Sequence, residues 1–230
     1  MSLSSKPKPL KGRPEPRVPV GTRRKPVSLE SGDRLTSTEF LRRYETRTDV
    51  KKAQLIEGTV VMPSPVRAEL HAKPDGIIQL WLGTYVLEHP ALEVYSNATL
   101  LLDPDNALQP DAILCTAPQP EGKVWLNDNG YLCGAPELVC EIAASSVSID
   151  LHDKFRAYRR NGIPEYLVWL VEEERVCWFH LVEQDYVEQE ADAGRLVSGV
   201  FPGLVLDIDA LLQMDRAKVI ATLREAMTGV

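Results

Sequence analysis

Three polar residues interrupt a stretch of the chain that is otherwise apolar. Asp111 opens the apolar run 112–115, Glu141 lies inside the apolar run 136–143, and Lys154 follows on a helix-like segment. A carboxylate in a buried strand costs several kcal/mol unless a cation or hydrogen-bond donors meet it. Two neighbouring acids can share a divalent cation, and a nearby amine can stabilise charge that develops on a phosphorus centre. These residue types therefore suit metal-assisted hydrolysis of a phosphodiester.

The elements that must position these residues follow from the hydrophobic pattern. The runs 110–115, 136–143 and 164–170 have the length and apolar content of buried strands. From Asp150, apolar residues recur at helical spacing, with Leu151, Phe155 and Tyr158 on the inner face. Lys154 lies about 60° from Leu151 around such a helix, at the border of that face. Asp150 is expected to cap this helix, and Gly162 is expected to end it.

Each of the three residues also has a simpler interpretation. An Asp after a Pro is commonly a turn residue. Glu141 could reach solvent past small residues at a strand end. A lysine at the border of a helix face usually extends its amine outward to water. The chemical hypothesis therefore depends on the three side chains converging beside one sheet.

The remaining segments predict an α/β (α+β) protein with a mixed central sheet flanked by helices. A helix is expected after the capping residue Thr36, and a hairpin over 53–62 with its turn at Glu57 and Gly58. A longer helix is expected over 68–87, and a polar loop through 122–130. Near the C-terminus we expect a hairpin around 176–188, a short strand over 205–208 and one closing helix from about Asp209.

Composition and charge divide the chain into a tail and a body. The net charge is −7, but residues 1–26 carry +7, which leaves −14 for the rest. Residues 1–30 are rich in proline and poor in large apolar residues, so we expect a disordered basic tail before a single domain over 31–230. No signal peptide or membrane-spanning run is visible, and the four cysteines lack paired spacing. These features predict a cytoplasmic protein with reduced thiols.

The ordered set of segments resembles the Uma2 family, which is grouped with the PD-(D/E)xK restriction-endonuclease-like nucleases. The resemblance rests on Asp111 after Pro110, on Glu141 in an apolar strand and on Lys154 in the next helix. Further segments of the chain agree with it: 54–58, 63–65 with His71 after it, 162–168 and 201–204.

The resemblance implies an Mg²⁺-dependent endonuclease acting on DNA, with Mn²⁺ as a substitute and a homodimer as a possible assembly. Asp111 and Glu141 would bind the metal ion, and Lys154 would act with them. The lysine of a standard Glu-x-Lys strand is replaced here by Ala143. Lys154 must therefore reach across from the helix.

Two more residues are candidates for the same cleft, and two other kinds of protein fit the pattern. Glu57 is either a metal contact or a turn residue, and His71 is either cleft-lining or structural. A catalytically silent nuclease-fold module for binding nucleic acid or protein would keep the scaffold without cutting. A structural or regulatory homodimer would leave Asp111 and Glu141 merely solvated.

Overall fold

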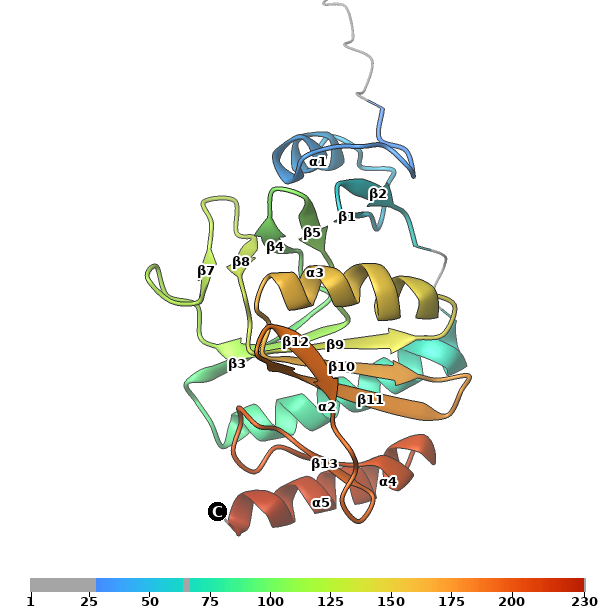
Figure 1. The fold of residues 1–230 in the computed structure, drawn as a ribbon, viewed down its shortest axis with the longest axis vertical. Helices are drawn as coiled ribbons and strands as arrows, with labels where there is room; N and C mark the ends of the chain where they lie inside the picture. The colour runs from blue at the N-terminus through green and yellow to red at the C-terminus, as the bar shows by residue number, and fades with distance from the viewer. Residues whose placement is uncertain (1–27, 64–66, 230) are drawn as a thin grey trace, which may run out of the picture.

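The computed structural model describes residues 28–63 and 67–229, and its centre is a mixed six-stranded sheet (Figure 1). The strand order is β12-β11-β10-β9-β6-β3, in which β9 and β10 run parallel and the other neighbours run antiparallel. The expected mixed central sheet is thereby confirmed. The strands are β3 (Leu92–Ser96), β6 (Ala112–Thr116), β9 (Leu138–Ala143), β10 (Glu165–Leu170), β11 (Arg175–Val182) and β12 (Asp185–Glu188).

Helices cover both faces of this sheet, which explains why β9 and β10 are almost continuously apolar. Helix α2 (Lys73–Leu87) lies on one face and α3 (Phe155–Arg160) on the other (Figure 1). Alternate residues of β9 enter the two layers: Cys140 packs in the core with α2, and Val139 packs in the core with α3. Glu141 has the parity of Val139, so it points to the α3 layer.

A second six-stranded sheet lies beyond α3, with the order β2-β1-β5-β4-β8-β7 (Figure 1). The predicted hairpin is present as β1 and β2, but it is one edge of this sheet rather than an isolated addition. The prediction of a polar loop over 122–130 is wrong, because β7 and β8 form a hairpin there. The strands are β1 (Gln54–Ile56), β2 (Thr59–Val61), β4 (Leu100–Asp103), β5 (Asn106–Leu108), β7 (Val124–Leu126) and β8 (Leu132–Gly134).

Helix α1 (Ser37–Tyr44) covers this second sheet. It begins where predicted, because the hydroxyl of Thr36 accepts a hydrogen bond from the backbone N–H of Glu39. Phe40 packs in one small core with Leu55 of β1.

The C-terminal region contains two helices where one was expected. A two-stranded sheet of β13 (Arg195–Val197) and β14 (Val205–Asp207) leads into α4 (Ile208–Leu212) and α5 (Arg216–Thr228). Met214 between the helices has a φ of 57°, in the left-handed region, which ends the first helix. Helix α5 then packs against α2 and closes that side of the core (Figure 1).

Two π-helical turns lead into the helices that flank the central sheet. The turn η1 (Ala68–Ala72) precedes α2, and η2 (Ile149–Lys154) precedes α3. The predicted helix over 68–87 is therefore present as η1 and α2. Such wide turns displace side chains from ordinary α-helical positions and recur at functional sites.

The N-terminal tail lies almost entirely outside the described residues. Of the range 1–30, only residues 28–30 are described, and Leu29 among them is buried in the core with α1. The domain boundary at residue 30 stays a prediction. Within 28–63 and 67–229, no helix combines the length and the apolar character needed to cross a membrane. The four cysteines are free and buried, as expected: Cys115, Cys133, Cys140 and Cys177.

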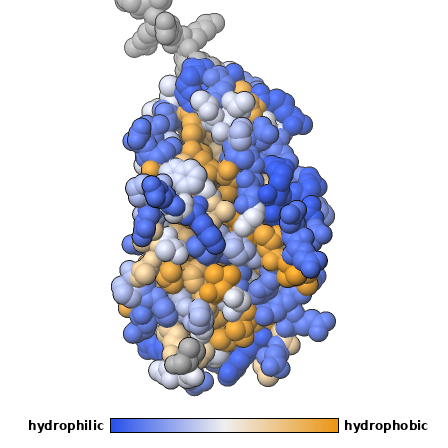
Figure 2. Space-filling view, turned by 60° about the vertical axis from the view of Figure 1, so that its left-hand side comes forward, coloured by the Kyte–Doolittle hydropathy of each residue, from blue (hydrophilic) through white to orange (hydrophobic). Residues whose placement is uncertain are grey.

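On the face in Figure 2, hydrophilic side chains dominate and the apolar ones gather in separate patches.

Candidate active site

Asp111 and Glu141 lie opposite each other on adjacent antiparallel strands. The register of β6 and β9 pairs Ala112 with Cys140, so the next positions outward are Asp111 and Glu141. Residues directly opposite in an antiparallel pair point to the same face of the sheet. Both acids are buried, with 3% and 2% of their surface exposed. A carboxylate oxygen of Asp111 accepts a hydrogen bond of 2.8 Å from the backbone N–H of Ile142, which fixes its orientation.

Lys154 reaches this face from the helical layer. Its Nζ lies 2.8 Å from Oε2 of Glu141 and 2.9 Å from Oδ1 of Asp150. The hydroxyl of Tyr158 donates a 2.7 Å hydrogen bond to Oε1 of Glu141. Both oxygens of Glu141 therefore have donors. The lysine is buried rather than extended into water, and it is the last residue of η2.

Asp150 is not the helix cap that its position suggested. It lies within η2, is almost fully buried, and accepts a hydrogen bond from the hydroxyl of Ser146. Its backbone carbonyl also accepts a hydrogen bond from Tyr166. Asp150 is therefore a fixed carboxylate that contacts the amine of Lys154 as closely as Glu141 does.

Negative charge is in excess in this buried group. Burial raises the pKa of Glu141 to about 8; Lys154 acts against that rise, while Asp150 and Asp111 add to it. Burial alone would lower the pKa of Lys154, but Asp150 and Glu141 outweigh it and hold that pKa above its usual value. Lys154 therefore stays cationic, and the excess of carboxylates around it leaves room for one more cation.

Asp111 has cationic neighbours of its own. Nε2 of His71 lies 3.4 Å from one carboxylate oxygen, and Nζ of Lys52 lies 3.9 Å from the other. Burial alone would raise the pKa of Asp111, but His71 and the N–H of Ile142 hold it below its usual value. The same contact with Asp111 raises the pKa of His71. Asp111 is therefore the more readily ionised of the two strand acids.

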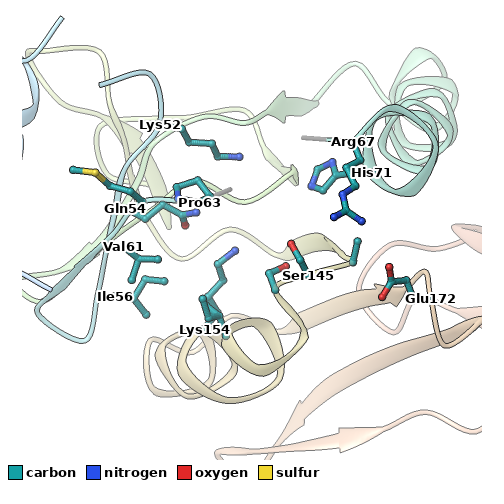
Figure 3. A pocket seen from close by; sticks show the side chains of 14 residues that line it. Lys52, Gln54, Ile56, Val61, Pro63, Arg67, His71, Ser145, Lys154 and Glu172 are labelled. Atoms are coloured by element: carbon teal, nitrogen blue, oxygen red, sulfur yellow. The ribbon is translucent and has the colours of Figure 1, made fainter. Parts of the chain in front are cut away.

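A cavity of about 550 Å³ lies over this group (Figure 3). His71 and Lys154, which contact the two acids, line the cavity, whereas Asp111 and Glu141 themselves do not. The other charged residues in its lining are Lys52, Arg67 and Glu172, so cations outnumber anions on an acidic body. In Figure 3 the nitrogen atoms of Lys52, Arg67, His71 and Lys154 point into one space.

Glu57 is not among the residues that line this cavity, and it lies in the turn between β1 and β2, as the second of its two interpretations expected. Its carboxylate binds Arg160 at 2.8 Å and Asn106 at 3.3 Å. The pKa of Glu57 is lowered, chiefly by Arg160. The same guanidinium lies 3.0 Å from Asp103, so Arg160 ties α3 to the turns of the second sheet.

Four residues of the site escaped the sequence reasoning: Lys52, Arg67, Asp150 and Tyr158. Asp150 stands four residues before Lys154, the spacing of an ion pair on one helical face, and this signal was available. Lys52 and Arg67 flank the hairpin in sequence, and only the folded chain shows that both reach the cavity.

The two strand acids fit a hard divalent cation with few protein ligands. Within the described ranges, no cluster of three or more His, Cys, Asp or Glu residues has the arrangement of a metal site. Mg²⁺ commonly takes one or two carboxylates and keeps several waters, so Asp111 and Glu141 would suffice. Asp150, 2.9 Å from the amine of Lys154, would keep that amine beside such an ion.

Comparisons with known proteins agree with the fold. The model of the family Uma2, described as "Putative restriction endonuclease", matches residues 37–209. A crystal structure described as a putative nuclease belonging to DUF820, from Anabaena variabilis, superimposes with a TM-score of 0.56 at 17% identity. The match covers 73% of this chain and 92% of that one. No curated protein matches the chain. The expected restriction-endonuclease-like fold is confirmed.

Proposed function

The chain belongs to the Uma2 family, and from this premise we propose that it is a metal-dependent endonuclease that hydrolyses phosphodiester bonds of DNA. One observation carries the proposal: the amine of Lys154 lies 2.8 Å from Glu141, although the two residues come from a helix and a strand. A lysine placed only for solubility would not be buried between two carboxylates. In a Glu-x-Lys strand the lysine would stand at position 143 of β9, which is Ala143 here. In this fold η2 supplies the amine instead.

Asp111 and Glu141 would hold the cation, with Mg²⁺ expected and Mn²⁺ as a substitute. When bound, such an ion supplies Lewis acidity toward a phosphate oxygen and makes a bound water more acidic. Lys154 would place a positive charge where the phosphorane oxygens develop negative charge. Lys52 and His71, which already face Asp111, would position the phosphate.

A supercoiled plasmid incubated with Mg²⁺ or Mn²⁺ tests the proposal. Replacing Asp111 with Asn or Glu141 with Gln preserves shape while removing a charged ligand, and we expect nicking to fall by about 100-fold or more. Glu137→Gln is the matched control, because Glu137 is also a buried carboxylate beside β9 but binds Thr116. Unchanged nicking by Asp111→Asn would refute the assignment.

A catalytically silent module remains the alternative, and metal binding distinguishes it. Calorimetry of the wild-type chain should show a site for Mg²⁺ or Mn²⁺ that Asp111→Asn lacks. Absence of any binding at millimolar metal would favour the silent module. The homodimer and the cytoplasmic location stay predictions, and light scattering of the purified chain would test the first.

A further inference from the structure

Among the described residues, the strand acids are almost fully buried beneath a small cavity. Asp111 and Glu141 are 3% and 2% exposed, and the residues that contact them, His71 and Lys154, form part of the cavity lining. A phosphate that is to meet a cation on these acids must therefore enter the cavity. The substrate must be able to bring one phosphate below the protein surface.

Apolar side chains line one side of the cavity, together with Lys52 and Gln54 (Figure 3). Ile56 and Val61, from the hairpin β1–β2, lie with Pro63 on one side, and Arg67 and His71 lie on the other (Figure 3). Lys154 projects from below toward the space between them (Figure 3). Further apolar lining comes from Met62 and Ile149. An anion with an attached apolar ring matches this division.

Its size fits one nucleotide better than a helix of DNA. About 550 Å³ falls in the range of pockets that enclose a small molecule. In a closed duplex, stacked and paired bases flank every phosphate, so a single nucleotide cannot enter a cavity unless it leaves the stack. An unpaired strand has no such constraint.

The negative charge of the chain beyond residue 26 also favours a single enclosed nucleotide over a duplex. The chain beyond residue 26 carries −14, and non-specific affinity for a duplex rests on neutralising many phosphates. A few cations around one cavity can neutralise a single phosphate and its neighbours. Affinity must then come from the enclosed nucleotide rather than from the length of the helix.

We propose that the cavity receives one unpaired nucleotide, with its phosphate among Lys52, Arg67 and His71 and its base against Ile56 and Val61 of the β1–β2 hairpin. The substrate class is accordingly single-stranded or locally unwound DNA, such as a flap or a strand end. The position of the cut rests on the proposed nuclease function, but the preference for an unpaired strand is a property of binding.

Binding can be measured without cleavage, by fluorescence anisotropy of the full chain in EDTA at fixed ionic strength. The probes are a labelled single strand, its blunt duplex and the same duplex with an unpaired flap. We expect the single strand and the flap to bind about tenfold tighter than the duplex. Equal or tighter binding of the blunt duplex would overturn the proposal.

Two variants assign the preference to the cavity. Val61→Glu places an anion on the apolar side, and Arg67→Glu reverses the charge of an exposed side chain. Each should lower single-strand affinity by about tenfold and leave weak duplex binding nearly unchanged. Val187→Glu is the control, because it adds the same charge at an exposed apolar position on β12. If both cavity variants fold, by circular dichroism, and bind the single strand like wild type, the assignment is wrong.

The outcomes separate this inference from the proposed function. Preferential binding of the single strand without any metal-dependent nicking would refute the proposed nuclease function and support the binding site for an unpaired nucleotide. Metal-dependent nicking of the plasmid, with equal affinity for duplex and single strand, would support the nuclease function and refute the preference for an unpaired strand.

Discussion

Asp150 and Lys154 stand one helical turn apart in η2, and their charged atoms lie 2.9 Å apart inside the protein. A second carboxylate, that of Glu141, lies 2.8 Å from the same amine. The amine is thus shared between one acid that could bind a metal ion and one that only orients it. This division of roles makes the contribution of Asp150 separable from that of Glu141.

Asp150→Asn should slow the reaction without weakening substrate binding. The amide keeps the shape but not the charge that holds Lys154, so we expect kcat to fall by about 10- to 100-fold with KM little changed. Asp153→Asn, on the exposed side of the same turn, should leave kcat at the wild-type value. Steady-state kinetics on a single-stranded oligonucleotide provides both constants. A fall confined to KM would show that Asp150 acts on substrate binding instead.

Removing the amine should destabilise the fold. Lys154→Met leaves Glu141 and Asp150 without their shared cation, and breaking a buried pair from one side costs about 3–5 kcal/mol. Urea denaturation at pH 7 measures the loss. The control is Lys218→Met, because Lys218 is 57% exposed and 3.6 Å from Asp207; it should cost less than about 1 kcal/mol. Similar losses from the two substitutions would contradict the buried pairing.

The raised pKa of Glu141 predicts a pH-dependent stability. Its pKa is about 8 in the folded chain and lower in the unfolded chain, so between these values the folded state binds one proton more. Stability then decreases as pH rises from about 4.5 to about 8, by at most about 1.4 kcal/mol per pH unit from this group. Glu141→Gln cannot lose that proton, so its stability should exceed the wild type increasingly toward pH 8. Thermal melts of both proteins at pH 5 and pH 8 measure the difference, and a constant difference would contradict the shift.

Arg160 should matter more for the local stability of α3 than its exposure suggests. It joins Glu57 and Asp103, at 2.8 and 3.0 Å, across from the other sheet. Arg160→Ala should cost about 1 kcal/mol and speed hydrogen exchange in α3, because a network of ion pairs is lost. Arg156→Ala removes a single exposed pair with Asp153 and should have a smaller effect. Equal exchange rates in the two variants would show that the Arg160 network is not an anchor.

The strands β6, β9 and β10 of the central sheet were predictable because they are buried on both faces. The runs around Asp111 and Glu141 are apolar at nearly every position, and no other element accommodates such a run at that length. The hairpin β7–β8 escaped prediction for the opposite reason. Trp125 and Leu126 on it are exposed, so its sequence resembles a loop.

The residues of the site could be predicted from the sequence better than the geometry that brings them together. Asp111, Glu141 and Lys154 could be selected as polar residues in apolar surroundings, but their registers depend on pairing between distant segments. Asp150 has the sequence of a cap, and only the π-helical turn carries it inward. Glu57 lies outside the cavity lining and pairs with Arg160, which lies 103 positions away in the chain.

Lys154 belongs to the helical layer, whereas Asp111 and Glu141 belong to the sheet. The three side chains therefore come together only when the helix is correctly placed on the sheet. In a Glu-x-Lys strand, the two groups are fixed by one backbone and cannot part without unfolding. Here a small tilt of η2 and α3 against the sheet would withdraw Lys154 while β6 and β9 keep both carboxylates in place. If the chain cuts phosphodiesters as proposed, its activity should depend on the position of this helix, and a contact that shifts the helix should inactivate the protein while leaving it folded.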